Sequence, residues 1–259
     1  MKTSRLLDRI QPSVTLALVA RTAELRAQGR DIVSFGAGEP DFPTPANVRA
    51  AATAAMEAGH TRYTAVAGVI ELRRAIAAYY AAHGARYDAN DIIVTAGAKH
   101  GLFNALIALL DPGDRVVVPA PYWVSYPEMV KVAGGTPVFI DTYPDFQITA
   151  ERIEKYVTPR TKMLLFNTPS NPTGVVATDQ VCRDVVKLSE KHNFLVLTDE
   201  IYDEFCYERI ERPAGSGKMR CASPAAYSEN LLLMRGFSNT YAMTGWRRGY
   251  ACGPKPIIE

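Results

Sequence analysis

Short runs of apolar residues alternate with segments of helical periodicity from residue 92 to the end of the chain. Polar residues rarely interrupt these runs, which is typical of parallel strands buried on both faces. Alternation of this kind predicts an α/β fold in which helices cover both faces of a mainly parallel, seven-stranded sheet. The strands are expected at 92–95, 115–119, 136–140, 162–167, 194–198, 231–235 and 248–252, and the helices between them at 98–110, 122–133, 150–156 and 178–193.

The last two predicted strands are separated only by residues 236–247. Parallel neighbours in a sheet need a crossover connection, which is usually a whole helix with a loop at each end. This connection is too short to hold a standard crossover helix. We therefore expect the strand at 248–252 to run antiparallel to its neighbours.

The two ends of the chain have a different pattern. Residues 14–28, 45–58 and 69–83 have helical periodicity, and 34–45 form a loop rich in glycine and proline. Residues 253–259 resemble the start of a helix with proline in its first turn. Because nothing completes that helix, we expect either a truncated chain or a protein that has lost its C-terminal part.

Composition and charge argue against several classes of protein. Apolar residues make up 47% of the chain and charged residues 22%, as in ordinary globular domains. The net charge of +2 gives no electrostatic reason to expect nucleic acid or a membrane as a partner. No apolar run reaches the roughly 20 residues of a membrane-spanning helix. The histidines form no metal-binding pair and the cysteines no C-x-x-C motif, so we expect no metal and a cytoplasmic setting.

Ligand-binding residues are expected where parallel strands end, because their carboxyl ends share one edge of the sheet. Gly97, Ala98 and Lys99 follow the first predicted strand and open a helix, whose free N–H groups would bind an anion. Trp123 follows the second strand and offers a flat aromatic face. Taken alone, a plain strand–helix turn explains the first group and core packing explains the tryptophan.

Three more polar residues follow later strands. Asn171 lies in a loop of prolines and glycine, where its amide could contact a ligand. Asp199 places a carboxylate at the end of an apolar strand, where burial is costly unless a cation such as a protonated ring nitrogen pairs with it. Arg247 could bind a phosphate through two hydrogen bonds. Turn chemistry, a helix N-cap and a surface ion pair are the respective alternatives.

The order of these signals resembles the fold-type I pyridoxal-phosphate enzymes. The most similar group is the class I aminotransferases, in particular their bacterial aspartate aminotransferase-like branch. The resemblance runs through nearly the whole chain. It rests on residues 34–42 (SFGAGEPDF), Tyr63, 121–123 (PYW), 171–174 (NPTG), 199–202 (DEIY) and 243–247 (MTGWR).

The resemblance implies pyridoxal 5'-phosphate as the cofactor. It also implies amino-group transfer between an amino acid, aspartate- or glutamate-like, and a 2-oxo acid. Gly97, Ala98, Lys99 and Arg247 would hold the cofactor phosphate. Tyr63 would reach that phosphate from the neighbouring subunit of a homodimer.

The same resemblance assigns the contacts to the cofactor ring and the substrate. Trp123 would stack on the pyridine ring, and Asp199 would pair with the ring nitrogen and keep it protonated. Asn171 and Tyr202 would hydrogen-bond the ring hydroxyl. Gly38, together with Trp123 and Asn171, would line the amino-acid site.

One position departs from the family pattern. Where the family has the Schiff-base lysine, within S-K-T or a close variant, this chain has Asn239 between Ser238 and Thr240. That lysine bonds to the cofactor and then moves the proton at the substrate carbon, and an amide does neither. Lys99 is expected near the phosphate and Lys218 lies in an unrelated loop, so neither is an obvious substitute. We therefore expect weak, reversible cofactor binding without a covalent bond.

The resemblance also divides the chain. Residues 1–45 would form an N-terminal arm and the start of a small domain, and 46–259 the large, cofactor-binding domain. Family members continue into a long helix and a small C-terminal domain, which supplies an arginine for the substrate α-carboxylate. No residue here can be assigned that role. Two alternatives stay open: another fold-type I activity such as a lyase, and an inactive fragment or cofactor-binding pseudoenzyme.

Overall fold

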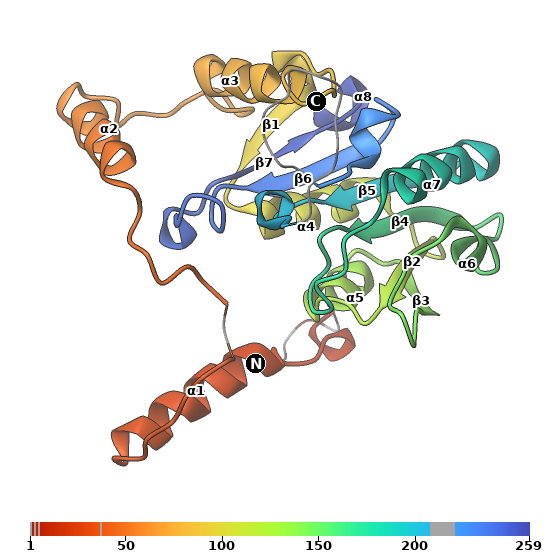
Figure 1. Cartoon of the computed structure of the whole chain (residues 1–259), viewed down its shortest axis with the longest axis horizontal. Helices are drawn as coiled ribbons and strands as arrows, with labels where there is room; N and C mark the ends of the chain where they lie inside the picture. The colour runs from red at the N-terminus through yellow and green to blue at the C-terminus, as the bar shows by residue number, and fades with distance from the viewer. Residues whose placement is uncertain (1, 3, 5, 37, 208–220) are drawn as a thin grey trace.

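A mixed sheet with helices on both of its faces forms the centre of the molecule (Figure 1). The computed structural model describes residues 2, 4, 6–36, 38–207 and 221–259. Seven strands of this described chain form one sheet in the order β1-β7-β6-β5-β4-β2-β3. They are β1 (Ile92–Thr95), β2 (Arg115–Ala120), β3 (Thr136–Asp141), β4 (Thr161–Asn167), β5 (Leu195–Asp199), β6 (Leu232–Gly236) and β7 (Gly249–Cys252).

Strand direction agrees with the sequence analysis. The strands β2 to β6 pair in parallel with one another, and β7 runs antiparallel to both of its neighbours, β1 and β6. The predicted fold class and the predicted antiparallel strand are therefore confirmed. Each strand begins and ends within one residue of its predicted position.

The helices match the predicted segments with two corrections. They are α1 (Val14–Ala27), α2 (Ala46–Glu57), α3 (Ile70–Ala81), α4 (Ala98–Leu109), α5 (Ser125–Val132), α6 (Ala150–Glu154), α7 (Asp179–His192) and α8 (Lys255–Ile258). The helix predicted at 122–133 begins only at Ser125, because residues before it form a turn in which Tyr126 N donates to Trp123 O at 3.0 Å. The helix predicted at 150–156 ends at Glu154, where two tighter turns follow.

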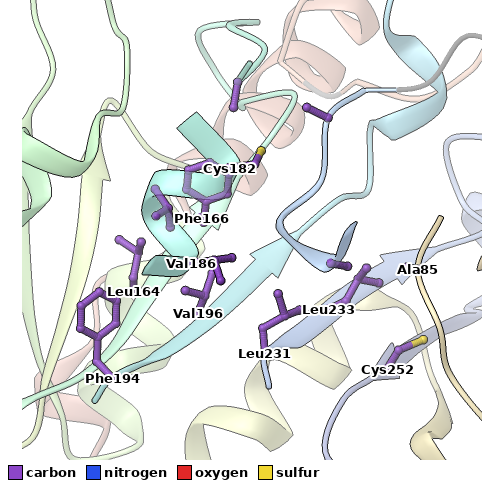
Figure 2. Packing of buried hydrophobic residues seen from close by; sticks show 14 of the residues in the cluster. Ala85, Leu164, Phe166, Cys182, Val186, Phe194, Val196, Leu231, Leu233 and Cys252 are labelled. Atoms are coloured by element: carbon purple, nitrogen blue, oxygen red, sulfur yellow. The ribbon is translucent and has the colours of Figure 1, made fainter. Parts of the chain in front are cut away.

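Alternating residues of the strands pack against different helices. On β4, Leu164 and Phe166 join one buried cluster, whereas Met163 and Leu165 join a second one on the opposite face. In Figure 2, Cys182 and Val186 of α7 lie against the strands in the first cluster. Burial of side chains of this size stabilises a fold by about 1.5–3 kcal/mol each. The strands are therefore fixed from both faces, which holds their carboxyl ends at one edge.

The N-terminal helices lie apart from the sheet (Figure 1). No residue of α1 or α2 is buried. Among the contacts that join this region to the sheet domain, Gln11 N donates to Glu128 Oε2 at 2.9 Å and Trp246 Nε1 donates to Thr44 Oγ1 at 3.0 Å. The apolar side chains of α1 are left uncovered by the rest of the described chain.

Candidate active site at the carboxyl edge of the sheet

Two neighbouring strands bring their last residues together. Asn167 at the end of β4 is in register with Asp199 at the end of β5, and Asn167 Nδ2 donates to Asp199 O at 2.8 Å. Asn167 Oδ1 accepts a hydrogen bond from Asn171 N at 2.7 Å. The loop that carries Asn171 is thereby fixed to the end of β5, so two of the predicted site residues lie at one edge.

Asp199 is a buried carboxylate that has no cationic partner among the residues that the structure describes. Asp199 is 5% exposed, and Tyr126 Oη donates a hydrogen bond to Asp199 Oδ2 at 2.7 Å. Ile201 N donates to Oδ1 at 3.3 Å. Within the described residues, no lysine or arginine lies at ion-pair distance from it. Burial raises the pKa of Asp199 to about 6, although the hydrogen bond from Tyr126 opposes that rise. The carboxylate is therefore suited to pair with a cation from a ligand.

Trp123 contacts Tyr126, the residue whose hydroxyl donates to this carboxylate. Its ring meets the Tyr126 ring edge to face, with the centroids 5.3 Å apart and the planes at 85°. Lys99 Nζ lies 4.7 Å from the centroid of the Trp123 ring. The indole is only partly buried, so an aromatic ligand could still contact it.

The start of α4 gathers two positive side chains. Gly97 precedes the helix with φ at +91°, a conformation that favours glycine, and a Cβ at this position would collide with the Arg247 guanidinium. Gly249 is equally restricted, because its Cβ would lie 2.5 Å from Ala98 N. The absence of a Cβ at Gly97 leaves room for the Arg247 guanidinium beside the positive end of the helix dipole.

No acidic residue within the described part of the chain neutralises this positive cluster. Arg247 Nη1 donates to Thr244 O at 2.7 Å, and neither Arg247 nor Lys99 has an ion pair with any described acidic residue. Burial, with a smaller effect from Arg247, lowers the pKa of Lys99. Two cations beside free helix N–H groups form a site for an anion such as a phosphate.

Asn171 and Tyr202 form a polar pair at the same edge. Asn171 Nδ2 donates to Tyr202 Oη at 3.3 Å. Burial raises the pKa of the Tyr202 phenol, so it stays protonated at neutral pH. A ligand hydroxyl could therefore find both a donor and an acceptor here.

Asn239 lies in the turn after β6, at the same edge of the sheet. The turn is closed by backbone hydrogen bonds, including Met243 N to Ser238 O at 2.8 Å. The Asn239 side chain is partly buried and makes no hydrogen bond to the described residues. Lys218, considered above as a substitute amine, lies outside the described residues. Among the described lysines, only Lys99 forms a hydrogen bond, an ion pair or a cation–π contact with the residues gathered here.

Two predicted residues do not join the others within one chain. Tyr63 is 107% exposed and contacts no site residue of its own chain. Gly38 is also exposed, with open space around it. Its segment nevertheless reaches the turn before Arg247, because Thr244 Oγ1 donates to Glu39 Oε2 at 2.9 Å.

Sequence reasoning missed Tyr126 and Asn167. Both were detectable: Asn167 is the last residue of a predicted apolar strand, and Tyr126 lies one helical turn after Trp123. Both also line a pocket with Asn171 between the ends of β2 and β4. The signal was weak because asparagine and tyrosine are common at strand ends and in cores.

The described residues contain no group of three potential metal ligands. None of the described helices combines the length and the apolarity needed to cross a bilayer.

The known proteins that this chain resembles in sequence are aminotransferases. The sequence model of the family "Aminotransferase class I and II" matches residues 30–259. The aspartate/prephenate aminotransferase of Thermus thermophilus is 44% identical and covers 99% of this chain, which spans 65% of that relative. The aspartate aminotransferase of Geobacillus stearothermophilus is 41% identical, and the chain again spans 65% of it.

Solved structures agree. A structure of the Thermus thermophilus aspartate aminotransferase with maleate superposes with a TM-score of 0.92 at 44% identity. It covers 100% of this chain, and the chain covers 66% of it. The chain therefore spans about 65% of the length of the relatives it matches.

The raised pKa of Asp199 predicts a pH-dependent gain in stability from Asp199→Asn. The Asp199 carboxylate binds a proton more tightly in the folded protein than in the unfolded chain, where aspartate titrates at about pH 3.9. The stabilising contribution of the protonated carboxyl is complete below that pH and is lost as the pH rises through about 6. Asp199→Asn should therefore raise the free energy of unfolding by roughly 2–3 kcal/mol at pH 7.5 and by far less at pH 4, in urea denaturation.

The exposed Asp31 provides a matched control, because Asp31→Asn should change stability little at either pH. If Asp199→Asn changed the free energy of unfolding equally at both pH values, burial of the ionised carboxylate would not be the source of the effect.

Proposed function

The chain belongs to the class I and II aminotransferases, of fold type I, and from that premise we propose that it binds pyridoxal 5'-phosphate at the carboxyl edge of the sheet. We further propose that the family reaction, amino-group transfer between an amino acid and a 2-oxo acid, is the activity of the whole protein. The buried carboxylate of Asp199, which faces no cation in the described chain, supports this assignment most directly.

The residues present fit the cofactor. Gly97, Ala98, Lys99 and Arg247 would hold its phosphate, since they form a positive cluster that no described acid neutralises. When bound, pyridoxal 5'-phosphate supplies an aldehyde that condenses with amines and a protonated ring that withdraws electrons from the substrate. The phosphate contacts anchor this group without taking part in that chemistry.

The ring contacts would come from other residues at the same edge of the sheet. Trp123 would stack on the pyridine ring, and Asp199 would hold a proton on the ring nitrogen through charge pairing. Asn171 and Tyr202 would bind the ring hydroxyl. Each of these groups is already oriented by a hydrogen bond or a ring contact, so little order would be lost on binding.

The names of the relatives support a proposal for the substrate class. They are named as aspartate and aspartate/prephenate aminotransferases, which supports an aspartate- or glutamate-like amino donor. Gly38 would line the amino-acid site with Trp123 and Asn171, and its segment reaches the turn before Arg247.

Asn239 favours a second candidate function, binding of the cofactor without turnover. The residue occupies the position of the family's cofactor-bonding lysine. A carboxamide is neither a nucleophile for an aldehyde nor a base at neutral pH, so no group at this position could accept a proton from the substrate. Binding and catalysis are thereby separated in this chain, and the first does not need the second.

We also propose a homodimer. Leu16, Val14 and Leu18 on α1 are 70%, 63% and 52% exposed, which is unusual for so many neighbouring apolar side chains. Residues 1–45 would act as the arm that covers a second copy, and 46–259 as the large domain. Tyr63, fully exposed in its own chain, would then reach the phosphate site of the partner.

The charge balance and the cysteines bear on partners and location. A net charge of +2 supports small-molecule partners rather than nucleic acid or a membrane surface. Cys182 and Cys252 are free, buried thiols. Free thiols fit a reducing compartment, so we propose the cytoplasm.

Phosphate recognition can be tested by binding. Pyridoxal 5'-phosphate should bind the native chain reversibly, and Arg247→Gln should weaken that binding by about tenfold or more, because a charged hydrogen-bond donor is lost. Pyridoxal, which has no phosphate, should bind both proteins alike in equilibrium dialysis. Arg248→Gln serves as the control, because Arg248 is the exposed neighbour of Arg247. Unchanged phosphate-dependent binding in Arg247→Gln, or none in the native chain, would contradict the proposal.

The role of position 239 can be tested by restoring an amine. After incubation with pyridoxal 5'-phosphate and borohydride reduction, Asn239→Lys should carry a covalent adduct at residue 239 by mass spectrometry, and the native chain should carry none there. Asn239→Arg is the matched control, because its charge is similar but its guanidinium does not condense with aldehydes at neutral pH. If the native chain already transfers amino groups from aspartate at the rates of its relatives, the role given to this position is wrong.

Dimer formation through α1 predicts a mass near twice the 28.4 kDa of one chain in sedimentation equilibrium. Leu16→Glu should shift the protein toward the monomer, because it places a charge in the proposed apolar contact. Tyr143→Glu, at another exposed apolar position that is distant from α1 in the chain, should leave the mass unchanged. A native monomer at tens of micromolar would exclude this assembly.

A further inference from the structure

One side chain outside the predicted site contacts two of its members. Tyr126 lies in the first turn of α5 and is 3% exposed. Its hydroxyl donates to Asp199 Oδ2 at 2.7 Å, and its ring meets Trp123 edge to face at 5.3 Å. The proposed ring-stacking residue and the proposed partner of the ring nitrogen are thus joined through a single phenol.

The hydrogen bond has only one possible direction at neutral pH. Burial and the neighbouring Asp199 raise the pKa of Tyr126 well above its ordinary value. The phenol therefore keeps its proton and donates the hydrogen bond, because an ionised carboxylate can only accept one. Ile201 N donates to the other carboxylate oxygen, at 3.3 Å. Among the described residues these two groups are the donors to the Asp199 carboxylate, and Tyr126 forms the shorter bond.

The balance at Asp199 makes this donor important. Burial favours the neutral carboxyl, whereas pairing with a protonated ring nitrogen needs the ionised form. A hydrogen bond to the ionised form opposes the effect of burial, and hydrogen bonds to charged groups are the stronger kind. Without Tyr126, Asp199 would be protonated at a higher pH and its Oδ2 would be free to rotate out of position.

We propose that Tyr126 is a positioning residue of the cofactor site: its hydroxyl keeps the Asp199 carboxylate ionised and fixed in orientation, while its ring sets the plane of Trp123. Tyr126 itself touches neither cofactor nor substrate in this assignment. The inference rests on the proposed function, because only a ligand with a protonated ring nitrogen gives Asp199 its partner.

The first test needs no cofactor. Asp199 can be titrated in the free protein by carbon-13 NMR of labelled aspartate carboxyls, with Asp199→Asn to assign its signal. Tyr126→Phe, which keeps the ring but removes the donor, should move the Asp199 midpoint upward by about one pH unit. Tyr80→Phe is the matched control, because it removes another buried hydroxyl, 3.2 Å from Tyr250 Oη and in the opposite core cluster. An Asp199 midpoint that is the same in Tyr126→Phe and native protein overturns the inference.

A second variant covers the case in which Tyr126→Phe does not fold. Insertion of 3-fluorotyrosine at position 126 keeps the shape of the side chain and makes the hydroxyl a stronger donor. The Asp199 midpoint should then move downward. A merely structural role of Tyr126 predicts no shift, and that result also overturns the inference.

The second test uses the cofactor and separates the two proposals. Tyr126→Phe should bind pyridoxal 5'-phosphate about tenfold more weakly at pH 7, with the acid limb of the affinity profile moved to higher pH. An analogue with carbon in place of the ring nitrogen should bind both proteins alike, and in an Asp199→Asn background Tyr126→Phe should add no further loss. No binding by the native chain contradicts the proposed function, and the titration of free Asp199 still decides the role of Tyr126. Equal cofactor affinity of native and Tyr126→Phe protein, at every pH, contradicts the role of Tyr126 alone.

Discussion

The burial of the Asp199 carboxylate at the end of β5 is the constraint on which the rest of the site depends. A carboxylate at this depth loses most of its hydration, and the described chain offers it hydrogen bonds but no counter-charge. Its position is not adjustable, because β5 lies between two parallel neighbours and is packed on both faces. The fold therefore holds a charge where the free protein gains nothing from it. Natural proteins retain such costs mainly at functional sites.

Sheet topology explains how the positive cluster of Lys99 and Arg247 forms at the same edge of the sheet as Asp199. The antiparallel β7 lies between β1 and β6, so it begins at the edge where those two strands end. Arg247 lies two residues before β7, and Gly97 lies two residues after β1. Arg247 consequently meets the start of α4 although 150 residues separate it from Gly97 in the chain. The glycines at 97 and 249 permit this contact, because a side chain at either position would occupy the space that the contact needs.

Much of this arrangement could be predicted from the sequence. Apolar runs located all seven strands, and the shortness of the segment before β7 predicted its direction. Rules about strand ends then placed Asp199, Asn171, Lys99 and Trp123 at one edge, where the structure has them. The contacts between distant residues were not predictable, since no local pattern signals that Tyr126 reaches Asp199 or that Arg247 packs on Gly97. Tyr63 and Gly38 show a different limit: their proposed partners belong to a second copy or to a ligand, so neither the sequence pattern nor one chain alone brings them to the site.

In the proposed assignment of Asn239, cofactor binding and chemistry are physically separable. The proposed phosphate and ring contacts would come from strand ends and the start of α4, where no hydrogen bond among the described residues involves the side chain at 239. The reactive group would come from one turn after β6, which backbone hydrogen bonds hold in shape whichever side chain it carries. A change from lysine to asparagine at this turn therefore removes a nucleophile and a base while the surrounding contacts stay in place. Such a site would still recognise its cofactor, because recognition is spread over many fixed groups, whereas the proton transfer depends on a single amine.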